Sequence, residues 1–237
     1  FYSSYLTESG KMIICSLKRK EQPITFAPPN PIIYISGCGR SPVAIDSKGN
    51  VFIFKEDPAS DPDYISTFEK PIYDITQTDA LTVCLDISGC TYGNGLLNGG
   101  SSDFAKIDAL KEKKIRSISS AEIHAFFVTD DNNAFIFGDI YNEEIDDIKF
   151  HDIVQVFIDS IEEDEPNKKE IEQNLIKTFR NNILQISTGC TFALILTCDG
   201  RLFSYGYNND GALLIDKESC ADIPKEIKIN GKISSIL

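Results

Sequence analysis

Carboxylates are the most numerous side chains in this sequence that could act as acids, bases or charged binding groups, and many of them lie in one segment. Between positions 139 and 172 the chain has thirteen acidic residues and three lysines, which account for most of its net charge of −13. Such a segment attracts basic protein surfaces, or it simply keeps a loop in solvent. We take these acidic residues as candidate partner-binding residues: Asp139, Glu143, Glu144, Asp146, Asp147, Glu162, Glu163, Asp164 and Glu165.

Two further patterns suggest catalysis at first sight, and neither has the required form. The stretch from Gly93 to Gly100 is rich in glycine, but it lacks the Lys-Ser/Thr of a P-loop and follows a hairpin strand instead of opening a βαβ unit. Acidic residues are numerous enough for a hydrolase, but none is paired in a recognisable way. We therefore expect no catalytic residue, no cofactor and no enzyme, with a hydrolase as the third hypothesis.

Cysteine and histidine usage indicates a reducing, intracellular setting. The chain has seven cysteines, without a Cys-x-x-Cys pair, and two histidines, His124 and His151. An odd number of thiols in or beside expected strands predicts neither a disulfide framework nor a metal site. We expect a cytoplasmic rather than a nuclear protein.

The elements that position these residues form an internal repeat. Tight turns recur at Gly10, Gly49, Gly89, Asn132 and Gly200. Ile32 and Ile35 stand seventeen and fourteen residues before Gly49, and isoleucine occupies the same two offsets before the next three turns. An internal repeat of this length predicts a repeat architecture before any local feature is considered.

Each repeat predicts one small sheet of four strands. Short β-branched and aromatic segments flank each turn as a β-hairpin, and the Ile-x-x-Ile segment adds a strand before it. A fourth extended segment follows, at residues 24–26, 64–68, 153–157 and 226–229, while its counterpart at 103–110 is equally well a short helix. The first four turns are 39 to 43 residues apart, which predicts an all-β protein, a β-propeller of four-stranded blades. A β-sandwich is the alternative.

The two ends of the chain suggest how such a ring is completed. Gly10 comes too early to have its own Ile-x-x-Ile strand, whereas Ile233 to Ile236 has that spacing without a hairpin after it. We expect this tail to complete the first blade and close a five-bladed ring, which leaves no unpaired sheet edge. The alternative is that the chain is a piece of a longer ring.

The interval of 68 residues between the last two turns contains an insertion at about residues 139–182. Residues 161–166 predict an acidic turn. Apolar residues at i, i+4, i+5 and i+8 then predict one short helix, with Ile171, Leu175, Ile176 and Phe179 on its apolar face. We interpret the insertion as a solvated surface excursion whose helix packs back on the blade. The functional alternative is a projecting acidic loop and helix that grips a basic partner.

The fifth unit has an outside likeness. The bend at Gly189, the turn Asp199-Gly200, the strand end at residues 203–206 and the loop from Asn208 to Leu213 resemble the repeat of the regulator of chromosome condensation family. The fourth unit matches in part, through His124 and residues 135–138. The resemblance implies a β-propeller, typically of seven blades. The family includes a nucleotide exchange factor for a small nuclear GTPase, hydrolase inhibitors and scaffold proteins.

The resemblance adds candidate site residues. His124 occupies the repeat's usual histidine position, which implies either a partner-facing role or a hydrogen bond that holds a turn. The polar loop of Asn208, Asn209 and Asp210 follows a strand, and we interpret it as a partner contact or as a turn former.

These observations predict one domain over residues 1–237, or part of a larger propeller, that acts as a non-catalytic protein-interaction scaffold. We expect it to be a module of a larger intracellular signalling protein, with guanine-nucleotide exchange on a small GTPase as the alternative function. The expected partner is a protein, either a small GTPase or a basic protein surface. Nucleic acid is not expected because an acidic chain repels phosphate backbones. Membrane insertion is not expected because no stretch of about 20 apolar residues exists.

Overall fold

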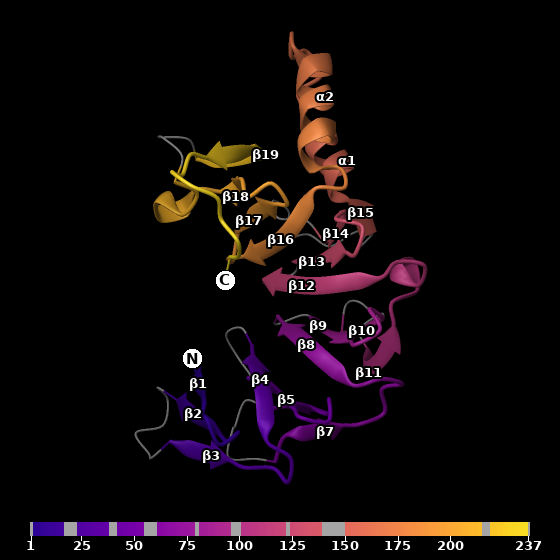
Figure 1. Cartoon of the computed structure of the whole chain (residues 1–237), viewed down its shortest axis with the longest axis vertical. Helices are drawn as coiled ribbons and strands as arrows, with labels where there is room; N and C mark the ends of the chain where they lie inside the picture. Colours follow the sequence, from indigo (N-terminus) through magenta and orange to yellow (C-terminus); the bar gives the residue numbers. More distant parts are fainter. Residues whose placement is uncertain are drawn as a thin grey trace. The chain divides into compact units, whose positions relative to one another are not determined.

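The computed structural model describes residues 2–16, 23–37, 42–54, 61–78, 81–95, 101–121, 124–138, 150–214 and 219–236. The chain divides into two compact units, Phe1–Lys114 and Ile115–Leu237. Antiparallel sheets dominate both units, and the described helices are confined to a few segments (Figure 1). The fold is therefore all-β in character, as the repeat predicts.

The first unit holds three sheets whose strands lie in sequence order. They consist of β1 (Tyr2–Leu6), β2 (Met12–Ser16) and β3 (Ile24–Phe26); of β4 (Ile32–Ser36), β5 (Val43–Asp46), β6 (Val51–Ile53) and β7 (Asp63–Ile65); and of β8 (Ile72–Gln77), β9 (Leu81–Asp86), β10 (Thr91–Gly95) and β11 (Ser101–Lys106). A 3-10 helix, Asp108–Leu110, follows β11. The segment for which the sequence left strand or helix open thus contains both.

The described residues of the second unit form two four-stranded sheets and two α-helices. The sheets consist of β12 (Ile115–Ala121), β13 (His124–Thr129), β14 (Ala134–Phe137) and β15 (Phe150–Asp152), and of β16 (Ile183–Thr188), β17 (Phe192–Thr197), β18 (Leu202–Tyr207) and β19 (Cys220–Ile227). The helices α1 (Ile153–Asp159) and α2 (Lys168–Phe179) lie between β15 and β16 in the sequence. A 3-10 turn, Asn209–Gly211, follows β18.

The turn residues join successive sheets as well as forming the hairpins. Gly49 and Asn132 have φ values of 79° and 63°, the left-handed conformation that these tight turns need. The carbonyl of the turn residue also accepts a hydrogen bond from the first isoleucine of the next repeat. We call this contact the turn latch, and it joins Ile32 N to Gly10 O at 2.8 Å, Ile72 N to Gly49 O at 3.1 Å and Ile183 N to Asn132 O at 2.8 Å. The fixed isoleucine offset in the sequence marks these latches.

The first and the last sheet each bear on how the ring of sheets is completed. In β1, Tyr5 is 56% exposed and Leu6 is 38% exposed, whereas Ile45, at the position equivalent to Leu6 in the next sheet, is fully buried. Among the described strands β1 pairs with β2 alone, whereas β5 pairs with both β4 and β6. The backbone N–H of Ile233 donates to the carbonyl of Gly200 at 3.2 Å, so the tail forms a turn latch with the last sheet. Closure of the ring by this tail stays a prediction, as does the alternative of a longer ring.

One expected strand is wrong. Residues 153–157 form α1 instead, and the short strand β15 before them supplies the fourth strand of its sheet. Asp152 caps the helix, since its Oδ1 accepts hydrogen bonds from the backbone N–H groups of Val154 at 2.9 Å and Gln155 at 3.3 Å. The described part of the insertion, residues 150–182, therefore contains two helices where the sequence predicted one.

Candidate partner-binding site

The acidic turn connects α1 and α2 of the second unit. Figure 1 shows α2 extending away from the sheet β16–β19, with the turn at residues 160–167 at its far end. The side chains of Glu162, Glu163 and Asp164 are exposed in this turn, and Glu165 is partly exposed. The described part of the insertion therefore places its carboxylates where a partner can reach them.

Buried aromatic rings fix the two helices to the last sheet. Phe157 of α1 and Phe179 of α2 are 0% and 1% exposed, and their ring centroids lie 5.4 Å apart. The Phe157 ring also contacts Tyr205 at 5.0 Å, and the Phe179 ring contacts Phe203 at 4.8 Å. The helix α2 thus packs back on the last sheet. This is one of the two interpretations that the sequence allowed for the insertion. Of the four apolar residues predicted for its face, Ile176 points outward and is 40% exposed.

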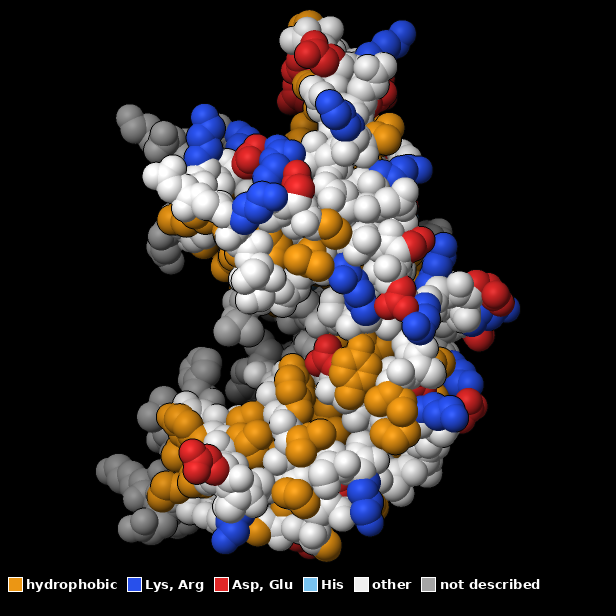
Figure 2. All heavy atoms as spheres, viewed as in Figure 1, with side chains coloured by type: hydrophobic (Ala, Val, Ile, Leu, Met, Phe, Trp, Pro, Cys, Tyr) orange, Lys and Arg blue, Asp and Glu red, His pale blue; other side chains and the backbone are white. Residues whose placement is uncertain are grey.

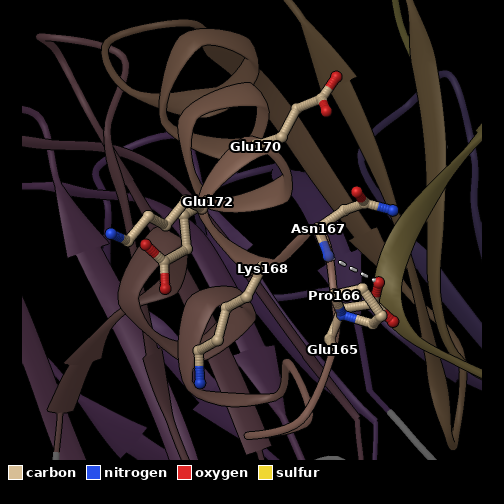
Figure 3. A pocket seen from close by; sticks show the side chains of 7 residues that line it. Glu165, Pro166, Asn167, Lys168, Glu170 and Glu172 are labelled. Carbon is tan, nitrogen blue, oxygen red and sulfur yellow. Dashed lines mark hydrogen bonds between the residues drawn. The ribbon is translucent and has the colours of Figure 1, made fainter.

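The carboxylates around the start of α2 do not converge. Glu165 Oε1 accepts a hydrogen bond from the backbone N–H of Asn167 at 3.2 Å, while Lys168 Nζ lies 3.9 Å from Glu163 Oε1. Figure 3 shows the carboxylates of Glu165, Glu170 and Glu172 pointing in different directions around an open hollow of about 610 Å³. The carboxylates labelled there are therefore not aimed at one common point.

The other described candidate residues lie outside the acidic turn. His124 begins β13, is 2% exposed, and packs edge-on against Phe126 with ring centroids 5.7 Å apart. Asn208 Oδ1 accepts a hydrogen bond from the backbone N–H of Leu213 at 3.0 Å, which shapes the turn after β18. Asn209 is exposed, and Asp210 belongs to the 3-10 turn. His124 is therefore a buried residue of its sheet, and Asn208 contacts the backbone of its own loop. A partner-facing role for either residue stays a prediction.

Five predicted site residues lie outside the described residues: Asp139, Glu143, Glu144, Asp146 and Asp147. The glycine-rich stretch ends β10 at Gly95, and residues 96–100 also lie outside the described part. Among the described residues no cluster of His, Cys, Asp or Glu has the form of a metal site. No described helix is both long and apolar enough to cross a membrane.

The sequence did not single out an apolar surface on the first unit. Ile33 and Tyr73 are 53% and 39% exposed, and each lies where a β-bulge shifts the register of its hairpin. Figure 2 shows hydrophobic side chains gathered over β4 and β8 on this unit. Tyr34 is also exposed, and burial of its hydroxyl together with the nearby charge of Asp74 raises the pKa of Tyr34 to about 12. In the sequence, Ile33 and Tyr73 share one repeat position, because each stands sixteen residues before its turn glycine.

Antiparallel sheets that repeat along the chain and are joined by turn latches define the class of the protein, a β-propeller. RCC1-like proteins are among the solved β-propellers to which its fold is similar. The fold is similar to human WBSCR16, with a TM-score of 0.72 and 13% identity over 98% of this chain and 66% of that one. It is similar to Prp20p from Saccharomyces cerevisiae, described with its binding properties to Gsp1p and histones, with a TM-score of 0.69 and 15% identity over 96% of this chain and 61% of that one.

Yeast RCC1 (Prp20) bound to Kap60 is a further neighbour, with a TM-score of 0.67 and 14% identity over 96% of this chain and 59% of that one. The chain therefore spans less than two thirds of the length of these three proteins. No family model matches the sequence, and no curated protein matches it. At such low identities the likeness concerns the fold alone, and the function has to be argued from the site.

Proposed function

We propose that the chain is a non-catalytic protein-interaction scaffold, in which a β-propeller carries an acidic helical hairpin that binds a basic surface of another protein. One observation supports this function above the others. Glu162, Glu163 and Asp164 are exposed on a turn whose two helices are fixed to a blade by buried aromatic rings. A pre-formed turn loses little conformational freedom on binding, and clustered carboxylates accelerate encounter with a basic surface.

The setting proposed for this scaffold is intracellular and cytoplasmic, as a module of a larger signalling protein. The described cysteines Cys15, Cys84, Cys90, Cys190, Cys198 and Cys220 are free thiols, which supports a reducing compartment.

Removing the negative charges of the acidic turn tests whether it binds the partner. In quantitative affinity capture from cell extract, the variant Glu162→Gln, Glu163→Gln, Asp164→Asn is expected to lose specific proteins that the wild-type chain retains. A loss of about tenfold in their recovery corresponds to three exposed charge pairs of a few tenths to one kcal/mol each. Added salt is expected to release the same proteins from the wild-type chain.

A matched control neutralises three exposed carboxylates of the first unit, Glu8→Gln, Asp61→Asn and Glu112→Gln. This control variant is expected to retain the same proteins as the wild type. If the turn variant also retains them all, the acidic turn is not the binding site and the proposal is wrong.

The alternative function is guanine-nucleotide exchange on a small GTPase, supported by the fold shared with yeast RCC1 (Prp20). Release of labelled nucleotide from a panel of small GTPases distinguishes the two functions. The scaffold proposal predicts no acceleration by micromolar chain, whereas acceleration that survives neutralisation of the acidic turn favours exchange.

A further inference from the structure

A cleft of about 260 Å³ lies beside the acidic turn, between the helical hairpin and β19. Isoleucines from three elements line it: Ile161 of the turn, Ile171 of α2 and Ile223 of β19. Ile161 is 4% exposed, and the other two are partly buried against the same hydrophobic core. They therefore present apolar surface to the cleft from a well-packed support.

Charged groups surround this apolar lining. Glu162 and Glu165 of the turn and Asp222 of β19 contribute three carboxylates, and Lys225 contributes one ammonium group. Cys220 also lines the cleft, and burial together with a hydrogen bond to Asp222 raises the pKa of its thiol. The thiol therefore stays neutral, and the cleft keeps an excess of negative charge at neutral pH.

An apolar lining together with carboxylates is complementary to a long cationic side chain. Such a side chain lays its methylene stem on apolar surface and keeps its charged group at the polar rim. Arginine fits better than lysine because its planar guanidinium is more weakly hydrated and pairs with carboxylates through two hydrogen bonds. The cleft, of about 260 Å³, has room for one such side chain.

We propose that this cleft binds a single arginine side chain of the partner protein, with its stem against Ile161, Ile171 and Ile223 and its guanidinium at Glu162, Glu165 and Asp222. The inference rests on the proposed function and assigns it a specific contact. It also brings β19 into the site, so that recognition does not depend on the exposed turn alone.

The probe is a short blocked peptide of alternating glycine and arginine, titrated into the intact chain with its isoleucine methyl groups labelled for NMR. The methyl signals of Ile161, Ile171 and Ile223 are expected to shift, whereas Ile176 on the outer side of α2 serves as an internal reference that stays unchanged. A peptide with citrulline in place of arginine keeps the shape without the charge and is expected to cause no shift. A lysine peptide is expected to bind more weakly, and equal binding would contradict an arginine site.

Two charge-matched variants separate the cleft from the general field of the hairpin. Glu162→Gln, Glu165→Gln, Asp222→Asn removes the carboxylates of the cleft and is expected to weaken the arginine peptide about tenfold. Glu163→Gln, Asp164→Asn, Glu172→Gln removes the same charge outside the cleft and is expected to weaken it about twofold through the long-range field.

Equal weakening by both variants would contradict the cleft and leave the acidic hairpin as a diffuse basic-partner site. If the arginine peptide shifts no signal of the hairpin or β19 while affinity capture still depends on the turn, the cleft is wrong and the scaffold proposal stands. If neither experiment shows binding, both are wrong.

Discussion

Replacing Phe157 by alanine is expected to lower the free energy of unfolding of the second unit by about 3 to 5 kcal/mol, the usual cost of removing a fully buried phenylalanine. The ring is 0% exposed and contacts both Phe179 and Tyr205. Its removal leaves a cavity where α1, α2 and the last sheet meet. Because Phe157 joins the insertion to the blade, the hairpin is expected to lose its fixed position before the sheets unfold.

Amide hydrogen exchange and urea unfolding followed by circular dichroism measure these two effects. Amides of α2 are expected to exchange faster in Phe157→Ala than in the wild type, and the unfolding midpoint of the second unit is expected to fall. The control is Ile176→Ala on the same helix, which removes a 40% exposed side chain and is expected to cost less than about 1 kcal/mol. Unchanged protection of α2 in Phe157→Ala would show that the aromatic rings do not hold the hairpin.

The second large effect is expected from Gly49→Ala, which acts on a turn latch in the first unit. Gly49 has a φ of 79°, and a Cβ added there would lie 2.5 Å from Cα of Pro71 and 2.6 Å from the backbone N of Ile72. The substitution combines left-handed strain with overlap against backbone atoms and with loss of the bond from Ile72 N to Gly49 O. We expect a loss of about 3 to 4 kcal/mol in the stability of the first unit.

Gly211→Ala is the matched control, because Gly211 has a φ of 77° and a Cβ added there meets no atom within 4 Å. It isolates the backbone strain and is expected to cost about 1 kcal/mol. Urea unfolding compares the two variants, and exchange of the Ile72 amide reports on the latch itself. Equal destabilisation by both substitutions would mean that close approach between successive sheets contributes nothing.

Much of the fold follows from the sequence because the repeat encodes both the hairpins and the latches. Gly49 marks a turn through its positive φ, and Ile72 marks the N–H that binds the carbonyl of Gly49. The turn residue recurs in each repeat, and the same latch is formed at Gly10, Asn132 and Gly200. Strand order and pairing partners were therefore predictable, and the turn chemistry tolerated Asn132 in place of glycine.

The error at residues 153–157 has a local cause. The β-branched run favoured a strand, but the carboxylate of Asp152 accepts the first N–H groups of a helix, and Ile153, Val154 and Phe157 are all buried in that conformation. Burial of this face outweighed strand propensity, which is a weak preference that depends on context. The aspartate before the run was the signal for the helix.

The candidate site was predictable in part. The exposed turn at Glu162 to Asp164 follows from charge and a nearby proline, because such a segment has nothing to bury. The contribution of β19 was not predictable, since Asp222 and Ile223 lie about 60 residues away in the sequence. Packing of Phe157 on Tyr205 and of Phe179 on Phe203 holds the hairpin against the sheet that contains their strand.

The most direct test of the scaffold proposal is carbodiimide cross-linking in cell extract, which joins carboxylates to lysine amines in contact without a spacer. Mass spectrometry then identifies which carboxylates of this chain are joined to lysines of a captured partner. The proposal predicts partner lysines joined to Glu162, Glu163 or Asp164, at positions that the neutralised variant loses. Partner lysines joined only to carboxylates elsewhere on the chain would contradict it.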